Sequence, residues 1–281
     1  MKYYHLFSAP LDSCPLFRDD KDRKFFLNRI VIYLSGKNIM VYAYCLMDNH
    51  IHFLMSGEEQ EIKDLFSDMK REYGKWLKKT DSVISVNLED FSVSLRVIKG
   101  ADDFKTVVAY ILRNPMVAGM GSPISYMWNS SFLYFNPMID LLRDYSLKEY
   151  GILKFRQEIA RREQIPMDYR ILDGIYNPRY WCQYKKVEQI FGRSVDYFKL
   201  LGKWGVENEE EAKMQQIERN AYSDSQILTK VNEYCTLIGV DKVEELSAID
   251  IKMLVRTLQE RWGASKKQIK RIIGSSVPFI E

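Results

Sequence analysis

The sequence has few of the residues that mark several common classes of protein. Its four cysteines form no CxxC pair, so it predicts neither a thiolate zinc site nor a disulfide framework. No apolar stretch reaches the length of about 18 residues that a membrane-spanning helix needs. The opening MKYYHLFSAP lacks the long apolar core of a signal peptide. We therefore expect a cytoplasmic protein that does not enter a membrane.

Basic and acidic residues nearly balance, so the chain has little excess of either charge. The net charge is only +3, which does not by itself indicate a nucleic-acid partner. The apolar fraction of 46% and the charged fraction of 28% are typical of a globular protein with a buried core. The length of 281 residues is enough for one large domain or two ordinary ones.

The first half of the chain alternates between strand and helix patterns. Strands are expected from aromatic or β-branched runs, and helices from apolar residues recurring three and four positions apart. The expected order is strand 3–9, helix 20–35, strands 39–47 and 50–56, helix 58–79, strand 91–98, and a helix from 102 that Pro115 and Gly119 close. This order predicts an α+β, ferredoxin-like sandwich whose helices pack on one face of an antiparallel sheet.

The second half reads differently. Beyond about residue 135 the pattern is helical and rich in Arg, Glu and Lys, as in KFRQEIARREQ. We therefore expect a first domain over 1–135 and an all-α region over 136–281. Within that region, 247–274 shows two helical patterns divided by a glycine, which predicts a helix-turn-helix.

Two of the chain's three histidines stand together as His50-Ile51-His52. Residues two apart on a strand point to the same face, so both imidazoles are placed to bind one metal ion. The flanking residues are apolar, which indicates that the two histidines occupy positions on a strand that otherwise belongs to the core. The alternative is a pair of hydrogen-bonded histidines at the edge of the core.

Tyr110 and Asn114 lie one helical turn apart in VVAYILRNP and share a helix face. An asparagine oxygen can bind a hard cation such as Mg²⁺ or Mn²⁺, and a tyrosine can act as a covalent nucleophile when a metal polarises its target. The alternative is that Tyr110 packs in the core and Asn114 caps the helix before Pro115.

Four segments together resemble the HUH single-tyrosine transposases. YAYCLMDNHIHFLM is similar to that family's signature, which usually reads close to YCLMPNHVHLL. LFRDDKDRKFFLNRI resembles its helix start, YILRNPMVAGM its tyrosine segment and SPISYMWNSS its "yxWSSy" segment. They occur in the family's order across the first domain. The most similar branch is the REP-associated tyrosine transposases with the insertion-sequence-200-like proteins.

The resemblance implies a role for each matching residue. His50 and His52 match the metal ligands, Asn114 the residue that completes the metal site, and Tyr110 the nucleophile. The implied reaction nicks and rejoins single-stranded or hairpin DNA through a 5′-phosphotyrosine, with Mg²⁺ or Mn²⁺ as cofactor. Relatives place the tyrosine helix in cis or in trans, so both a monomer and a homodimer are consistent with the resemblance.

Some residues depart from the family pattern or offer alternatives. The chain has SAP at 8–10 where the family has an "RGN"-like turn, SVISVNLEDF matches the family poorly, and Asp48 replaces a common proline. Tyr73 is an alternative nucleophile, although its spacing with apolar neighbours favours packing. His5, within an aromatic cluster, is interpreted as structural.

The last segment carries seven basic residues against two acidic ones between 249 and 274. Basic residues on a second helix suit contacts with DNA phosphates, and Lys266, Lys267, Lys270 and Arg271 are the candidates for binding duplex DNA. The alternative is a solvated helix face.

Two further functions remain open, a domesticated DNA-binding regulator without catalysis and a replication-initiator-like nickase.

Overall fold

A computed structural model describes residues 2–11, 15–80, 86, 88, 91–158, 168–202, 224–260, 262, 264 and 266–274. Its contacts divide the chain into two compact units, unit 1 over Met1–Val206 and unit 2 over Glu207–Glu281. The domain boundary expected at residue 135 falls inside unit 1. Among the described residues, no helix has the length and apolar character needed to cross a membrane.

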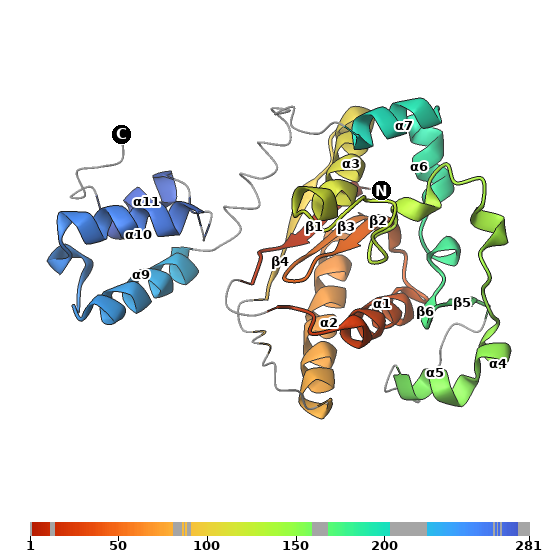
Figure 1. Ribbon diagram of the computed structural model, residues 1–281, viewed down its shortest axis with the longest axis horizontal. Coiled ribbons are helices and arrows are strands. Elements are labelled where there is room, and N and C mark those ends of the chain that lie inside the picture. The colour runs from red at the N-terminus through yellow and green to blue at the C-terminus, as the bar shows by residue number, and fades with distance from the viewer. Residues whose placement is uncertain are drawn as a thin grey trace. The chain divides into compact units, whose positions relative to one another are not determined.

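A four-stranded antiparallel sheet forms the centre of unit 1 (Figure 1). The strands are β1 (Lys2–Ser8), β2 (Met40–Leu46), β3 (Ile51–Gly57) and β4 (Val93–Val97), in the spatial order β2-β3-β1-β4. β1 and β3 are the central strands and are buried almost throughout, which explains their nearly continuous apolar sequences. All four strands agree with the sequence prediction to within about two residues at each end.

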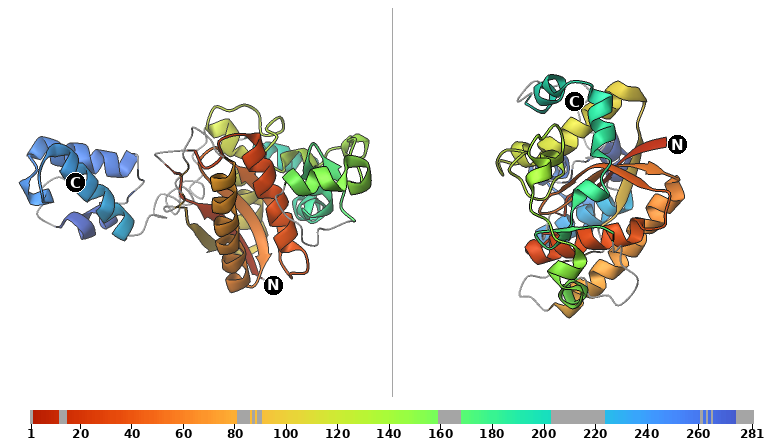
Figure 2. Two further views of the ribbon diagram at one scale, coloured as in Figure 1. Left: turned by 90° about the horizontal axis from the view of Figure 1, so that it is seen from below. Right: turned by 90° about the vertical axis from the view of Figure 1, so that its right-hand side faces the viewer.

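Helices cover both faces of this sheet. The helices α1 (Asp20–Leu34) and α2 (Glu59–Lys79) run side by side below the strands in Figure 1 and appear together again in Figure 2, whereas α3 (Gly100–Val117) lies above. Ring contacts identify the faces: Phe53 of β3 meets Phe66 of α2, and Tyr3 of β1 meets Phe104 of α3. The expectation that all helices share one face was wrong. Periodicity shows that α3 has an apolar stripe but not which face of the sheet the stripe covers.

The third helix also continues past its proline. The sequence predicted that Pro115 and Gly119 close the helix, and α3 ends between them at Val117, with Pro115 in its last turn. A proline in a helix cannot donate a hydrogen bond to the carbonyl four residues earlier, which here belongs to Ile111. The side-chain amide of Asn114 donates to the Ile111 carbonyl at 3.4 Å and to the Tyr110 carbonyl at 3.0 Å. This compensation allows the helix to pass the proline.

The described residues between α3 and residue 202 complete unit 1. Its short elements are η1 (Ser131–Leu133), η2 (Ile139–Leu141), α4 (Leu147–Tyr150), α5 (Ile152–Glu158), β5 (Ile171–Leu172), β6 (Ile175–Tyr176), η3 (Pro178–Tyr180), α6 (Tyr184–Phe191) and α7 (Ser194–Leu201). The hairpin β5–β6 corrects the all-α prediction for 136–281, since its two-residue strands are too short to give an alternating pattern. Asn28 of α1 holds the hairpin by bonding the Gly174 carbonyl and the Tyr176 amide.

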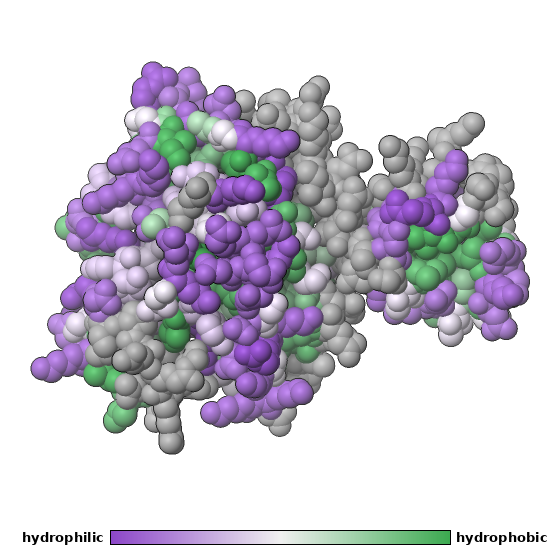
Figure 3. Space-filling view, turned by 180° about the vertical axis from the view of Figure 1, so that it is seen from behind, coloured by the Kyte–Doolittle hydropathy of each residue, from purple (hydrophilic) through white to green (hydrophobic). Residues whose placement is uncertain are grey.

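Unit 2 is helical in its described part. It contains α9 (Asp224–Ile238), η4 (Val243–Glu245), α10 (Ala248–Glu260) and α11 (Lys266–Ile273), and the three α-helices contact one another. Figure 3 shows an apolar area on this unit bordered by hydrophilic residues. Among the described residues of the unit, the exposed large apolar side chains are Leu228, Leu237, Ile238, Ile249 and Met253.

Candidate active site

The site begins at the turn between β2 and β3. His50 lies in this turn, one residue before β3 starts, and its carbonyl accepts a 2.9 Å hydrogen bond from the Met47 amide. The turn is fixed from outside as well, because the Asp48 carbonyl accepts from the amides of Leu16 and Phe17 at 2.7 and 3.1 Å. His50 therefore stands on a tightly held backbone.

A charged contact ties the same turn to α1. Arg23, which follows the N-cap Asp19 by one turn, pairs with the Asp48 carboxylate. The Arg23 guanidinium also lies 5.8 Å from the centre of the Trp128 ring. The ion pair of Asp48 with Arg23 therefore restrains the turn. The LFRDDKDRKFFLNRI segment thus supports the histidine turn.

His52 lies on β3 and is fully buried, while His50 is partly exposed. The centres of the two rings are 4.8 Å apart and the rings are perpendicular. Burial lowers the pKa of His50 to about 4, against small opposing effects of Asn114 and Asp48. Burial also lowers the pKa of His52 well below its usual value, helped by the neighbouring histidines. Both imidazoles are neutral near pH 7 and can each offer a lone pair.

Asn114 on α3 interacts with both histidines. Its amide nitrogen is engaged by the Tyr110 and Ile111 carbonyls, as Pro115 requires, so its carbonyl oxygen is the atom left for the imidazoles. An acceptor stabilises an imidazolium, so the Asn114 contact opposes the lowering of each histidine pKa by burial. The Asn-Pro pair therefore gives the helix end a defined oxygen ligand.

Tyr110 lies one turn before Asn114 and is 8% exposed. Its ring packs edge-on against His52, with 5.7 Å between ring centres. The next turn of α3 is held by Arg113, whose guanidinium donates to the Leu200 carbonyl of α7 at 3.1 Å. The helices α6 and α7 both contact α3, so the segment 184–201 braces the tyrosine helix. Residues 50, 52, 110 and 114, predicted from the sequence as one site, thus lie together.

Two neighbours of the histidines were not predicted as site residues. Asn49 places its side-chain oxygen 2.8 Å from Nδ1 of His50. His5 on β1, interpreted from the sequence as structural, places Nε2 3.2 Å from Nδ1 of His52. Both contacts depend on strand pairing or turn geometry, and the only sequence signal was a third histidine in a chain with three.

The alternative nucleophile lies on the other face of the sheet. Tyr73 of α2 is fully buried against Phe17 and Phe26, and its hydroxyl donates to the Leu16 carbonyl at 2.7 Å. Burial raises the pKa of Tyr73 far above its usual value. Tyr73 is separated from the histidines by the sheet and serves packing.

The side chains at the site have the chemistry of a divalent metal centre. Two neutral imidazoles and an amide oxygen suit Mn²⁺ well, and Mg²⁺ less well because it prefers oxygen ligands throughout. No group of three His, Cys, Asp or Glu side chains with metal-ligand geometry occurs in the described part of the chain. The third member of this site is an asparagine, which such a group does not include.

The basic candidates in unit 2 differ from one another. Lys270 is exposed, while Arg271 forms a two-pronged ion pair with Asp224 of α9 at 2.5 and 2.6 Å. Arg271 therefore joins two helices of the unit. Lys266 and Lys267 start α11, but their side chains lie outside the described residues.

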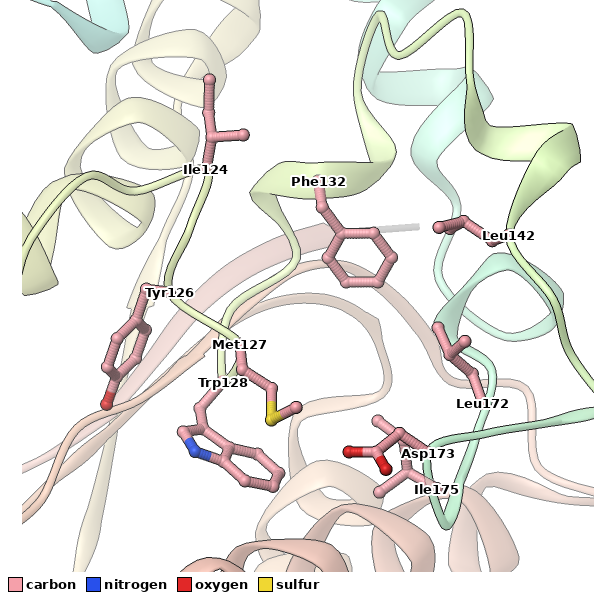
Figure 4. A pocket seen from close by; sticks show the side chains of 9 residues that line it. All are labelled: Ile124, Tyr126, Met127, Trp128, Phe132, Leu142, Leu172, Asp173 and Ile175. Carbon is pink, nitrogen blue, oxygen red and sulfur yellow. The ribbon is translucent and has the colours of Figure 1, made fainter.

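A separate apolar cavity of about 300 Å³ lies between the segment after α3 and the β5–β6 hairpin (Figure 4). Trp128 and Phe132 contribute rings to its wall, and Asp173 adds a carboxylate. Asp173 pairs with Lys24 of α1 at 3.3 Å. The cavity's wall includes neither the histidines nor Tyr110. Next to it, Tyr126 and Trp128 bond to the backbone of Leu46, so SPISYMWNSS covers the free edge of β2.

The site thus combines His50 and His52, from the β2–β3 turn and the start of β3, with Tyr110 and Asn114, from one turn of α3. Residues 2–114 match the family described as "Transposase IS200 like". A solved structure described as a REP-associated tyrosine transposase bound to a REP hairpin is similar at 11% identity, with a TM-score of 0.39, over 47% of this chain and 77% of that one. None of the curated proteins compared with the chain matches it.

Proposed function

We propose that the protein is a metal-dependent DNA strand transferase that nicks and rejoins single-stranded DNA through a 5′-phosphotyrosine on Tyr110. The observation that carries the proposal is the meeting of His50, His52 and Asn114 beside the Tyr110 ring. The match of residues 2–114 to a transposase family supports DNA as the substrate. The strand order β2-β3-β1-β4 supports a ferredoxin-like core, to which α3 adds the tyrosine from the opposite face.

His50, His52 and Asn114 would hold a divalent ion, and a bound ion supplies a Lewis acid that stabilises charge on the scissile phosphate. The chain's own contribution is positioning. The β2–β3 turn positions His50, and β3 positions His52. The hydrogen bonds from the Asn114 amide nitrogen to the Tyr110 and Ile111 carbonyls orient the Asn114 oxygen. Since all three are held by backbone contacts, little reorganisation accompanies binding of the phosphate.

In the proposed step, the Tyr110 oxygen bonds to phosphorus as the bond from phosphorus to the 3′-oxygen breaks. The phenol gives up its proton and the departing 3′-oxygen takes one, which leaves a free 3′-hydroxyl and a 5′-phosphotyrosine. Attack by another 3′-hydroxyl on this ester reverses the step. The tyrosyl ester conserves the energy of the broken bond, so rejoining needs no nucleotide cofactor.

We further propose a hairpin-flanked single strand as the substrate, in keeping with the sequence resemblance to REP-associated transposases. Unit 2 would add contacts to duplex DNA through α11, where Lys270 and Arg271 are the exposed basic residues among the described side chains and Arg271 is already paired with Asp224. The active unit is a monomer if α3 serves its own histidines, as the contacts within the single chain favour.

The test compares two tyrosines that lie on opposite faces of the sheet. The full chain, its Tyr110→Phe variant and its Tyr73→Phe variant are each incubated with an end-labelled hairpin oligonucleotide and Mn²⁺, and covalent adducts are separated on a denaturing gel. We expect adducts from the wild type and Tyr73→Phe and none from Tyr110→Phe. An adduct formed by Tyr110→Phe would overturn the assignment. A wild type that binds the hairpin but forms no adduct would indicate a DNA-binding protein without cleavage.

A further inference from the structure

The two site histidines are each held at the same ring atom. His50 and His52 both have Nδ1 within hydrogen-bond distance of a neighbouring side chain, Asn49 at 2.8 Å and His5 at 3.2 Å. A neutral imidazole carries one N–H and one lone pair, so the hydrogen bond at Nδ1 decides whether Nε2 can bind a metal. The partners of Nδ1 therefore bear on metal binding although they do not face the ion.

For His50 the direction of the hydrogen bond follows from the partner. The contact atom of Asn49 is its side-chain oxygen, which can only accept, so Nδ1 of His50 carries the proton and Nε2 carries the lone pair. The amide nitrogen of Asn49 points instead toward the Leu11 carbonyl, at 3.4 Å. This second contact supports the assigned orientation of the amide.

We propose that His5 is a positioning residue that does for His52 what Asn49 does for His50: its Nε2 accepts the Nδ1 proton of His52 and so directs the Nε2 lone pair of His52 to the metal ion. This inference rests on the proposed function, because it concerns the metal-bound state of His52. In that state Nδ1 of His52 must donate, and His5 Nε2 lies 3.2 Å away. Such outer contacts are the usual means of fixing a ligating histidine.

The surroundings of His5 suit an acceptor. His5 is 1% exposed, and its ring stacks on His52 with 5.4 Å between ring centres. In the sheet it lies opposite Arg96 of β4, whose guanidinium pairs with Asp103 of α3 at 2.7 and 3.1 Å. Burial disfavours a charged imidazolium, so the His5 ring can keep a lone pair that accepts a hydrogen bond.

A purely structural His5 predicts different behaviour from an accepting one, and two substitutions separate them. His5→Gln keeps a hydrogen-bond acceptor of similar reach, whereas His5→Leu keeps the volume and removes the acceptor. If His5 only packs, Leu should serve at least as well as Gln in this buried position. If His5 accepts from His52, Gln should preserve metal binding and Leu should weaken it.

The experiment measures Mn²⁺ affinity by titration calorimetry on the full chain in four forms: wild type, His5→Gln, His5→Leu and Asn114→Ala. Folding of each is checked by circular dichroism. We expect Mn²⁺ binding to weaken about 10- to 100-fold in His5→Leu, the usual effect of losing an outer contact, and to stay nearer the wild type in His5→Gln. Equal affinity of His5→Leu and wild type would overturn the role of His5 while leaving the proposed function intact.

A second readout reports the tautomer directly. The chain has three histidines, so a long-range ¹H–¹⁵N correlation spectrum shows three imidazoles at most. With Zn²⁺ as a diamagnetic ion, His52 should carry its proton on Nδ1. A proton on His5 Nε2 in that state would contradict the inference. A wild type that binds neither ion would remove the metal site itself, and the proposed function and this inference would fall together.

Discussion

The two faces of the sheet in unit 1 each carry a buried tyrosine, but the two tyrosines have different surroundings. Each face carries a helix with a buried tyrosine, Tyr110 on α3 and Tyr73 on α2. On the α2 face the tyrosine is surrounded by phenylalanines and its hydroxyl is held by a backbone carbonyl. On the α3 face the tyrosine meets two histidines. The difference shows that the neighbours of a tyrosine across the sheet, and not its burial or its helix, distinguish a reactive candidate from a packing residue.

The largest expected effect comes from removing a histidine from the α3 face. His52→Ala deletes a proposed ligand, and a metal ion contributes several kcal/mol to such a transition state, so adduct formation should fall by at least about 100-fold. Mn²⁺ should also no longer raise the Tm of the variant. Phe53, the next residue on β3, points to the opposite face, and Phe53→Leu serves as the matched control. A normal Mn²⁺-induced Tm shift in His52→Ala would contradict the metal site.

The α3 face should also make stability depend on pH. The pKa values of His50 and His5 are lowered to about 4 and about 3, below the usual value in the unfolded chain. The unfolded state therefore binds protons first as pH falls through about 6.5, and the folded state loses stability from there toward the folded pKa values.

Between pH 7 and pH 5 we expect the free energy of unfolding to fall by about 1–2 kcal/mol for each of these histidines. Urea unfolding at the two pH values measures the difference. His5→Leu should show a smaller fall than the wild type, since one of the titrating rings is gone. A free energy of unfolding that is the same at both pH values would show that the histidines are not buried as described.

The α2 face offers the opposite result, a change in stability without a change in activity. Tyr73→Phe removes the hydroxyl that bonds the buried Leu16 carbonyl, which should cost about 1–2 kcal/mol of unfolding free energy. Adduct formation under folding conditions should be unchanged. If Tyr73→Phe lowers adduct formation as far as Tyr110→Phe does, the two faces are not functionally distinct.

A smaller effect is expected at the turn that carries His50. Asp48→Asn removes the charge that pairs with Arg23, and since Asp48 is about half-exposed the pair contributes no more than about 1 kcal/mol. Misplacement of His50 should reduce the rate of adduct formation by at most about tenfold. Asp20→Asn removes the more exposed carboxylate beside the same arginine and is the control. Equal rates in both variants would mean that the backbone bonds alone hold the turn.

The smallest effect is expected in unit 2. Lys270→Ala should weaken duplex binding and reduce the salt slope of the affinity by about one ion, whereas Arg271→Ala should mainly loosen the pairing of α11 with α9. Fluorescence anisotropy with a duplex at several salt concentrations measures the slopes. An unchanged slope in Lys270→Ala would exclude that residue from the DNA contact.

Much of unit 1 could be predicted because its signals are local. Alternating and three-four spacing located the strands and helices, and the resemblance to the HUH family pointed to four candidate site residues in the HxH and Tyr-Asn segments. What the patterns do not encode is pairing. The face that α3 covers depends on the path of the chain after β4, and the contact of His5 with His52 depends on the register of β1 with β3, in which Phe7 stands opposite His52.

Other features were not predicted because they depend on single side-chain hydrogen bonds, very short strands or contacts between distant helices. Pro115 and Gly119 bracket the observed helix end at Val117, but the bond from the Asn114 amide to the carbonyl that the proline leaves could not be read from the sequence. The β5–β6 hairpin has strands of two residues and depends on Asn28 of a distant helix. Unit 1 extends beyond residue 135 because α6 and α7 pack on α3, a contact that composition alone does not show.

The central claim is that Tyr110 becomes joined to DNA, and peptide mapping tests it most directly. The wild-type chain is reacted with a hairpin oligonucleotide and Mn²⁺, digested with nuclease and trypsin, and analysed by mass spectrometry. The account predicts a nucleotide remnant on the peptide that contains Tyr110. A remnant on the peptide that contains Tyr73, or on any residue other than Tyr110, would contradict it.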